Sequence, residues 1–337
     1  MSEDNLTFYE KANLADKLSV IGIPLDIGKD GTGTAKAPGY LRSHGLLEML
    51  DSIGLSWHDF KDIVCTPKES ANLGDTHVKY LEEIVRVAEE SARFVNQEIS
   101  AGKKVLALGG DHAISVGTIS GASVACGGDL GVIWIDAHGD MMTHENTISG
   151  NIHGMPSSAM MGLGHPALTN ILKPGSKIKK ENIVYIGLKD LDQAEVDLIR
   201  REKLTAITVM DLMRHGFSAV TNAVDALNQR VKNIWVSCDV DSIDSQDSPA
   251  TIMATRGGLS YREITNIARY IGKECSLVGM DLVEVVPDRD VDHKTAQIAI
   301  ELIAHFFGAE YNWYTQYMKQ EAKKQETRNR VDDVLAV

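Results

Sequence analysis

The sequence predicts an α/β fold in which a mainly parallel sheet carries helices on both faces. Short apolar runs alternate with longer amphipathic segments along most of the 337 residues. The short runs are continuously apolar, which is typical of strands that are buried on both faces. Repeated alternation of strands and helices favours crossover connections between parallel strands. A three-layer α/β/α arrangement is therefore expected.

Seven segments have the length and composition of buried strands: 18–23, 104–108, 131–135, 182–186, 204–208, 233–237 and 277–280. Helical periodicity marks segments between them, most clearly 79–99, 261–271 and 295–307. In the first of these, apolar residues such as Ile84, Ala88 and Ala92 recur at helical spacing. No linker, low-complexity tract or internal repeat divides the sequence. We expect one domain over residues 1–337, with its core at about 18–311 and a polar tail at 316–337.

Composition excludes several classes of function. The formal net charge of -13 argues against nucleic acid or an anionic membrane as a partner. No apolar stretch is long enough to span a bilayer, and the polar first 17 residues do not form a signal peptide. The four cysteines are widely spaced, which favours reduced thiols over a disulfide framework. These features predict a cytoplasmic protein.

Three short acidic and histidine motifs stand just after predicted strands. They are GGDH at 109–112, DAHGD at 136–140 and DVD at 239–241. Side-chain direction repeats every second residue in an extended segment, so alternate residues of each motif can share one side. Open α/β sheets place their chemistry at strand ends, and the location of these motifs agrees with that rule.

Carboxylates and imidazoles that converge on one point repel each other unless a cation holds them together. The motifs supply six candidate ligands: His112, Asp136, His138, Asp140, Asp239 and Asp241. Six ligands suffice for two ions that share some of them, which predicts a two-metal hydrolase. A single aspartate after a strand is often only a turn residue or helix N-cap, and this alternative stays open for Asp111 and Asp244.

The donor types indicate which metal and which nucleophile to expect. An oxygen-rich site with some imidazole suits manganese, although cobalt, nickel, iron or zinc can also occupy it. Two close divalent ions can share a water and lower its pKa, so that hydroxide forms at neutral pH. No GxSxG motif supplies a competing serine nucleophile.

Two further residues can complete a reaction centre. His153, in the loop SGNIHG at 149–154, can transfer a proton near neutral pH, although a lone loop histidine is more often a surface residue. Glu284 follows the last predicted strand, and a carboxylate in an apolar segment needs a cationic partner such as a guanidinium. The glycine-rich segment 28–34 matches no phosphate-binding motif and is interpreted as a mobile loop at a pocket rim.

The motifs, taken in order, resemble those of the arginase (ureohydrolase) family over about residues 20–311. The matching segments are LGGDH at 108–112, DAHGD at 136–140, SGNIHG at 149–154, DVD at 239–241 and DLVE at 281–284. The resemblance implies a sheet of about eight mostly parallel strands. It also implies a homo-oligomer, a trimer or hexamer, that acts on a small guanidino substrate.

The resemblance further implies two Mn²⁺ ions per subunit, which Asp136 and Asp239 bridge together with a nucleophilic hydroxide. One ion would be held by His112, Asp136, Asp140 and Asp239, and the other by Asp136, His138, Asp239 and Asp241. Glu284 would bind the guanidinium of the substrate, and His153 would act as proton shuttle or acid.

The family member that fits best is an arginase, which hydrolyses L-arginine to L-ornithine and urea. The amino-acid end of the substrate would be bound by Ser149, Asn151, Asp192 and Glu195, in segments similar to those of arginases. Two departures bear on the substrate: Met142 stands where the family has asparagine, and Met253 replaces a threonine near the metals. The alternatives are an agmatinase or other guanidino-compound hydrolase with altered specificity, and a catalytically quiet metal-binding homologue. Metal-dependent deacetylases have a related fold, but SGNIHG disfavours them.

Overall fold

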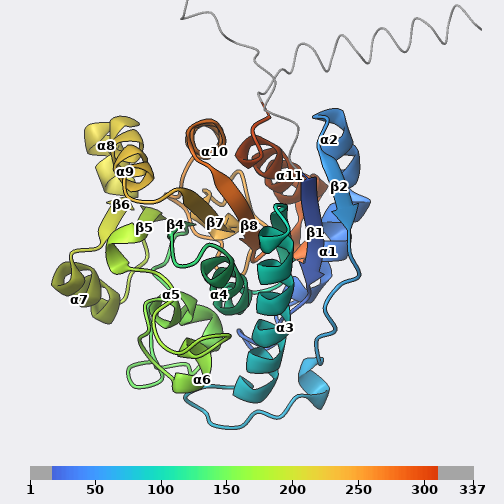
Figure 1. Ribbon diagram of the computed structural model, residues 1–337, viewed down its shortest axis with the longest axis vertical. Coiled ribbons are helices and arrows are strands. Elements are labelled where there is room, and N and C mark those ends of the chain that lie inside the picture. The colour runs from blue at the N-terminus through green and yellow to red at the C-terminus, as the bar shows by residue number, and fades with distance from the viewer. Residues whose placement is uncertain (1–16, 310–337) are drawn as a thin grey trace, which may run out of the picture.

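The computed structural model describes residues 17–309, and all strand pairs in this range are parallel (Figure 1). The strands form one eight-stranded sheet in the order β2-β1-β3-β8-β7-β4-β5-β6. Their bounds are β1 (Lys17–Ile23), β2 (Ser56–Asp59), β3 (Lys104–Gly109), β4 (Leu130–Ile135), β5 (Ile183–Leu188), β6 (Thr205–Thr208), β7 (Asn233–Asp239) and β8 (Leu277–Val283). The predicted parallel α/β fold is confirmed.

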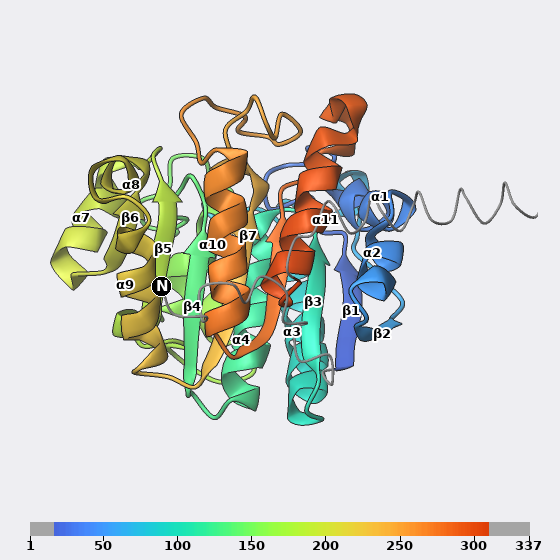
Figure 2. The ribbon, with the colours of Figure 1, turned by 90° about the horizontal axis from the view of Figure 1, so that it is seen from above.

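Helices cover both faces of the sheet, as expected for a three-layer arrangement (Figure 2). One face packs against α1 (Ala37–Ser43), α2 (Leu46–Ser52), α8 (Val209–His215), α9 (Ser218–Asn228), α10 (Tyr261–Glu274) and α11 (Lys294–Phe306). The other packs against α3 (Leu81–Ser100), α4 (Ser115–Ala125), α5 (Pro156–Met160), α6 (Pro166–Thr169) and α7 (Gln193–Glu202).

The continuous apolar runs of the strands follow from this double burial. In β3, Val105 and Ala107 join the core under α3 and α4, whereas Leu106 and Leu108 join the core under the opposite helices. Alternate side chains of a strand point to opposite faces, so a strand covered on both sides must be apolar at every position.

The seven predicted strands are all present, with ends that differ by a few residues. Strand β8 continues to Val283, beyond the predicted end at 280. The apolar run is interrupted by Asp281, but this residue is buried inside the strand. The eighth strand, β2, was not predicted. It has four residues, lies at the sheet edge beside β1 and is partly exposed, so its sequence lacks an apolar run. The predicted helices correspond to α3, α10 and α11.

Residues 1–16 and 310–337 are outside the described range, so the predicted polar tail at 316–337 is too. Between residues 17 and 309, every helix is too short or too polar to cross a bilayer.

The packing of β8 against β7 predicts the effect of a small substitution. A Cβ at Gly279 would lie 2.5 Å from the ring of Trp235 and 2.5 Å from the backbone oxygen of Val105. Gly279→Ala should therefore destabilise the fold by roughly 1–3 kcal/mol, as overpacking does. Gly39→Ala, in helix α1 with no atom within 4 Å of the new Cβ, should stabilise it by up to about 1 kcal/mol. Denaturant unfolding of both variants measures the difference. Equal stabilities would contradict the packing argument.

Candidate metal centre

The six predicted ligands meet at the carboxyl edge of the central strands. They follow or end three strands, β3, β4 and β7, which together with β8 form the middle of the sheet. The carboxyl ends of parallel strands lie on one edge, so motifs far apart in sequence come together there. The ligands are His112 after β3, then Asp136, His138 and Asp140 after β4, and Asp239 and Asp241 at the end of β7.

One group of ligands surrounds the buried ring of His112. Its Nδ1 atom lies near three carboxylate oxygens, at 3.1 Å from Asp136 Oδ2, 3.0 Å from Asp140 Oδ2 and 3.3 Å from Asp239 Oδ2. This nitrogen forms no hydrogen bond with the described residues. Two ligands at right angles, each about 2.1 Å from an ion, are about 3 Å apart. The spacing therefore fits ligands of one cation better than a hydrogen-bonded histidine.

A second group surrounds His138 and shares Asp136 with the first. The Nδ1 atom of His138 lies 3.3 Å from Asp136 Oδ1 and 3.2 Å from Asp241 Oδ2. Asp136 thus turns one oxygen to each histidine. Its orientation is fixed, because Oδ1 accepts from the backbone N–H of His138 and Oδ2 from Trp134 Nε1. Two adjacent sets of ligand atoms with one common carboxylate are the arrangement that a pair of ions requires.

Burial and mutual repulsion make this cluster unfavourable without a cation. Burial and the charge of Asp136 raise the pKa of Asp241 to about 6, and burial with the neighbouring carboxylates also raises the pKa of Asp239. Burial lowers the pKa of His138, but the carboxylates of Asp136 and Asp241 outweigh it and raise the pKa to about 12. The cluster therefore holds protons that a divalent cation can replace. The donor set fits a metal ion.

A buried polar network fixes the ring of His112 on the side opposite to the candidate metal ligands. The ring stacks on Trp134 at 4.2 Å, and its Nε2 atom lies 2.9 Å from Ser237 Oγ. Ser237 donates in turn to Asp281, whose carboxylate also accepts hydrogen bonds from Ser115, Thr118 and Trp235. Such partners orient a histidine so that its other nitrogen faces the metal. The sequence signal for Ser237 is its spacing, two residues before Asp239 on the same side of β7.

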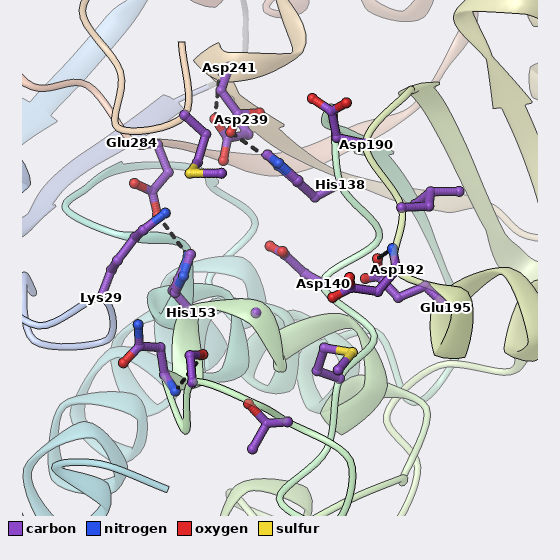
Figure 3. Close-up of a pocket in the computed structure, with 17 residues that line it drawn as sticks. Lys29, His138, Asp140, His153, Asp190, Asp192, Glu195, Asp239, Asp241 and Glu284 are labelled. Carbon is purple, nitrogen blue, oxygen red and sulfur yellow. Dashed lines mark hydrogen bonds and ion pairs between the residues drawn. The ribbon is translucent and has the colours of Figure 1, made fainter. Parts of the chain in front are cut away.

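Glu284 and His153 lie side by side at the edge of the cluster (Figure 3). Glu284 has a left-handed backbone (φ 68°), and its Oε1 atom accepts from the backbone N–H of His112 at 2.9 Å. Its Oε2 atom is buried and has no partner among the described residues. The Nδ1 atom of His153 lies 3.6 Å from Glu284 Oε1. Burial lowers the pKa of His153, but the Glu284 carboxylate outweighs it and raises the pKa above its ordinary value.

A cavity of about 510 Å³ opens onto this group. Its walls include the predicted substrate contacts Ser149, Asn151 and Asp192, together with Met142 and Met253. The sequence argument did not identify Lys29 or Asp190, which also line the cavity. Lys29 belongs to the glycine-rich segment 28–34, so the interpretation of that segment as a loop at a pocket rim is confirmed.

Glu195 reaches the cavity wall but already has partners for both of its oxygens. Oε1 accepts from Met141 N–H and Oε2 from Asp192 N–H, each at 3.0 Å, and the residue is 4% exposed. Its geometry is that of a residue that positions the Asp192 loop. Asp111 caps a short helical turn, and Asp244 accepts hydrogen bonds from the backbone of a loop. Both therefore have the turn or capping role that was left open for a single aspartate after a strand.

The network of Ser237 and Asp281 behind the His112 ring predicts how metal affinity depends on Ser237. Ser237→Ala removes the group that fixes the ring and should weaken Mn²⁺ binding by about 10- to 100-fold. Calorimetric titration of metal-free protein with Mn²⁺ measures the affinity. Ser120→Ala is a matched control, because this buried serine donates only to Val116 O inside α4. Equal affinities for the two variants would remove the proposed role of the network.

Comparison with known proteins agrees with this geometry. The sequence model of the Arginase family matches residues 16–308. The arginase of Brevibacillus brevis is 37% identical over 292 residues, which cover 86% of this chain and 97% of that protein. The arginase structure from Bacillus caldovelox has a TM-score of 0.84 at 35% identity and covers 87% and 99% of the two chains. An Entamoeba histolytica arginase in complex with L-ornithine has a TM-score of 0.81 at 30% identity, with coverage of 87% and 99%. The chain is thus a member of the arginase family.

Proposed function

We propose that this protein is an arginase that uses two Mn²⁺ ions to hydrolyse L-arginine to L-ornithine and urea. The single observation that carries the proposal is the buried histidine–aspartate cluster beside a free carboxylate oxygen of Glu284. Relatives named arginase, similar over 86% of the chain, support the same activity. Assembly into trimers or hexamers and a cytoplasmic location are expectations from the family resemblance.

The two ions would share Asp136 and Asp239. His112 and Asp140 would complete the site of one ion, and His138 and Asp241 would complete the other. Oxygen donors with one imidazole for each ion suit manganese. When bound, such ions lower the pKa of water enough for it to attack a guanidinium carbon at neutral pH.

Glu284 would bind and orient the guanidinium. The backbone N–H of His112 fixes its Oε1 atom, which leaves Oε2 as an acceptor at the cavity wall. Guanidinium N–H groups form strong, charge-assisted hydrogen bonds with a carboxylate. The contact would hold the guanidinium carbon beside Asp239 and Asp241, which line the same cavity.

His153 would supply the proton that the leaving amine needs. When the bond between the guanidinium carbon and the side-chain nitrogen of the substrate breaks, that nitrogen must be protonated to leave as an amine. The Glu284 carboxylate favours the protonated imidazole, so a proton is held close to the bond that breaks.

The amino-acid end of the substrate would lie near Asp192, Ser149 and Asn151. The Asp192 carboxylate suits the α-amino group, and the serine hydroxyl and asparagine amide can donate to the α-carboxylate. Met142 and Met253 line the cavity but donate no hydrogen bond. This favours, as the second candidate, a guanidino-compound hydrolase with altered specificity. The complete ligand set argues against a catalytically quiet protein.

Removal of the proton donor should separate catalysis from metal binding. We expect His153→Ala to lower kcat by about 10²- to 10⁴-fold, because general acid catalysis is lost, with unchanged manganese content. Urea release and elemental analysis measure the two quantities. His144→Ala is the control, since this loop histidine packs against His165 and is not among the cavity-lining residues. Loss of metal in His153→Ala, or unchanged turnover, would refute the role.

Urea release from a panel of guanidino compounds tests the proposed substrate. With added Mn²⁺, the protein should hydrolyse L-arginine faster than agmatine or guanidinobutyrate at equal concentration. Met142→Asn should lower KM for arginine by about tenfold, because an amide can donate to the carboxylate. Agmatine lacks that carboxylate, so its KM should change little and serves as the internal control. Faster hydrolysis of agmatine by the unmodified protein would favour the second candidate.

A further inference from the structure

The cavity is strongly acidic, and Lys29 is the only lysine or arginine among the described residues that line it. The carboxylic residues of the wall are Asp140, Asp190, Asp192, Glu195, Asp239, Asp241 and Glu284. A substrate with cationic groups at both ends finds counter-charges throughout such a cavity. The ammonium of Lys29 is the cation that lysine and arginine side chains of the described range offer to an anionic group of the substrate in this cavity.

The backbone at Lys29 is held firmly at the cavity wall. The carbonyl of Gly28 accepts a hydrogen bond from the backbone N–H of His153 at 3.2 Å. A Cβ at Gly28 would lie 2.4 Å from Asp111 Oδ1, so the loop packs closely on the GGDH motif. The carboxylate of Asp26 accepts from backbone N–H groups and a hydroxyl within 32–34 and closes the loop. The backbone from which the Lys29 side chain starts is therefore fixed at the cavity wall.

Among residues 17–309, no hydrogen bond or ion pair joins the ammonium of Lys29 to another residue. Nearby lysines differ in this respect, since Lys36 pairs with Asp288 at 2.5 Å and Lys68 with Asp30 at 2.9 Å. Figure 3 shows the Lys29 side chain running along the cavity wall toward Glu284 and His153, with Asp190 on the opposite side of the cavity. A half-buried cation without a partner, at the wall of a ligand cavity, is available to a ligand.

The other donors of the cavity point to the group that Lys29 binds. Asn151 accepts from Lys79 Nζ through Oδ1 at 3.2 Å, which leaves its amide N–H groups free to donate. Met142 and Met253 offer no donor. Among the lysines and arginines of the described range, only Lys29 is therefore placed to pair with a carboxylate of the substrate in this cavity.

We propose that Lys29 binds the carboxylate of the substrate and selects guanidino compounds that carry an acid group. The proposal rests on the proposed guanidino-hydrolase function and names the residue that recognises the acid. A charged hydrogen bond to the carboxylate strengthens binding of L-arginine but not of agmatine, which is arginine without that group. The competing view is that Lys29 only offsets the negative charge of the cavity, in which case its removal would strengthen binding of agmatine, a dication, and would not weaken binding of L-arginine.

Lys29→Met tests the proposal through the ratio of KM for L-arginine to KM for agmatine in the manganese-loaded enzyme. The ratio should rise on the order of ten- to a hundredfold through a higher KM for L-arginine, with KM for agmatine little changed, because a charged hydrogen bond is lost with one substrate only. Lys29→Arg should restore most of the ratio. Lys36→Met is the control, since Lys36 is exposed, pairs with Asp288 and is not among the cavity-lining residues. A ratio unchanged in Lys29→Met, or one that rises only because KM for agmatine falls, overturns the proposal.

Calorimetry with product-like ligands gives a readout that does not need turnover. L-ornithine and putrescine differ by the same carboxylate, so Lys29→Met should weaken ornithine binding to the manganese-loaded protein and leave the putrescine affinity within about twofold. Equal effects on both ligands, or none, refute carboxylate binding. If the unmodified protein releases urea from no guanidino compound, the proposed function fails, whereas the ornithine and putrescine affinities still decide the role of Lys29.

Discussion

Four aspartates buried at one edge of the sheet impose the constraint on which the candidate site depends, because their negative charges repel each other. Asp136, Asp140, Asp239 and Asp241 are each 7% exposed or less, and no lysine or arginine among residues 17–309 forms an ion pair with them. Charges in such surroundings persist only when a cation or protons compensate them. The fold supplies the rigid frame for this arrangement through the four central strands, which bring their carboxyl ends together.

Buried contacts fix the ring of His112, and two residues of the candidate site have a strained backbone. The ring of His112 is fixed by Trp134 on one face and by Ser237 at its far nitrogen. Asp140 and Glu284 both have left-handed backbones, with φ of 50° and 68°. Residues with side chains adopt this conformation at a cost, and such strain persists where surrounding contacts enforce it. Here Glu284 N–H donates to the carbonyl of Gly110, which holds the carboxylate at the cavity.

In the proposed function, reaction chemistry and substrate choice would arise from different parts of the chain. The candidate metal ligands follow strands whose positions the sheet determines, whereas the residues that would contact the substrate lie on loops such as 28–34 and 149–154. Loops change with little effect on the fold, so specificity can shift while the chemistry is retained. Met142, Met253 and Lys29 are all in such loops, and all line the cavity.

Seven of the eight strands, the helices on both faces of the sheet and the candidate metal ligands could be predicted from the sequence, because apolar runs and the motifs that follow them are local patterns. Local patterns did not reveal β2, a short edge strand without an apolar run, or the role of Glu195, whose oxygens are used by the backbone of Met141 and Asp192. They also gave no sign that Lys29 lies beside His153, because the contact joins loops 125 residues apart through the Gly28 carbonyl. Only the order of strands in the sheet decides which loops meet, and that order depends on long-range packing.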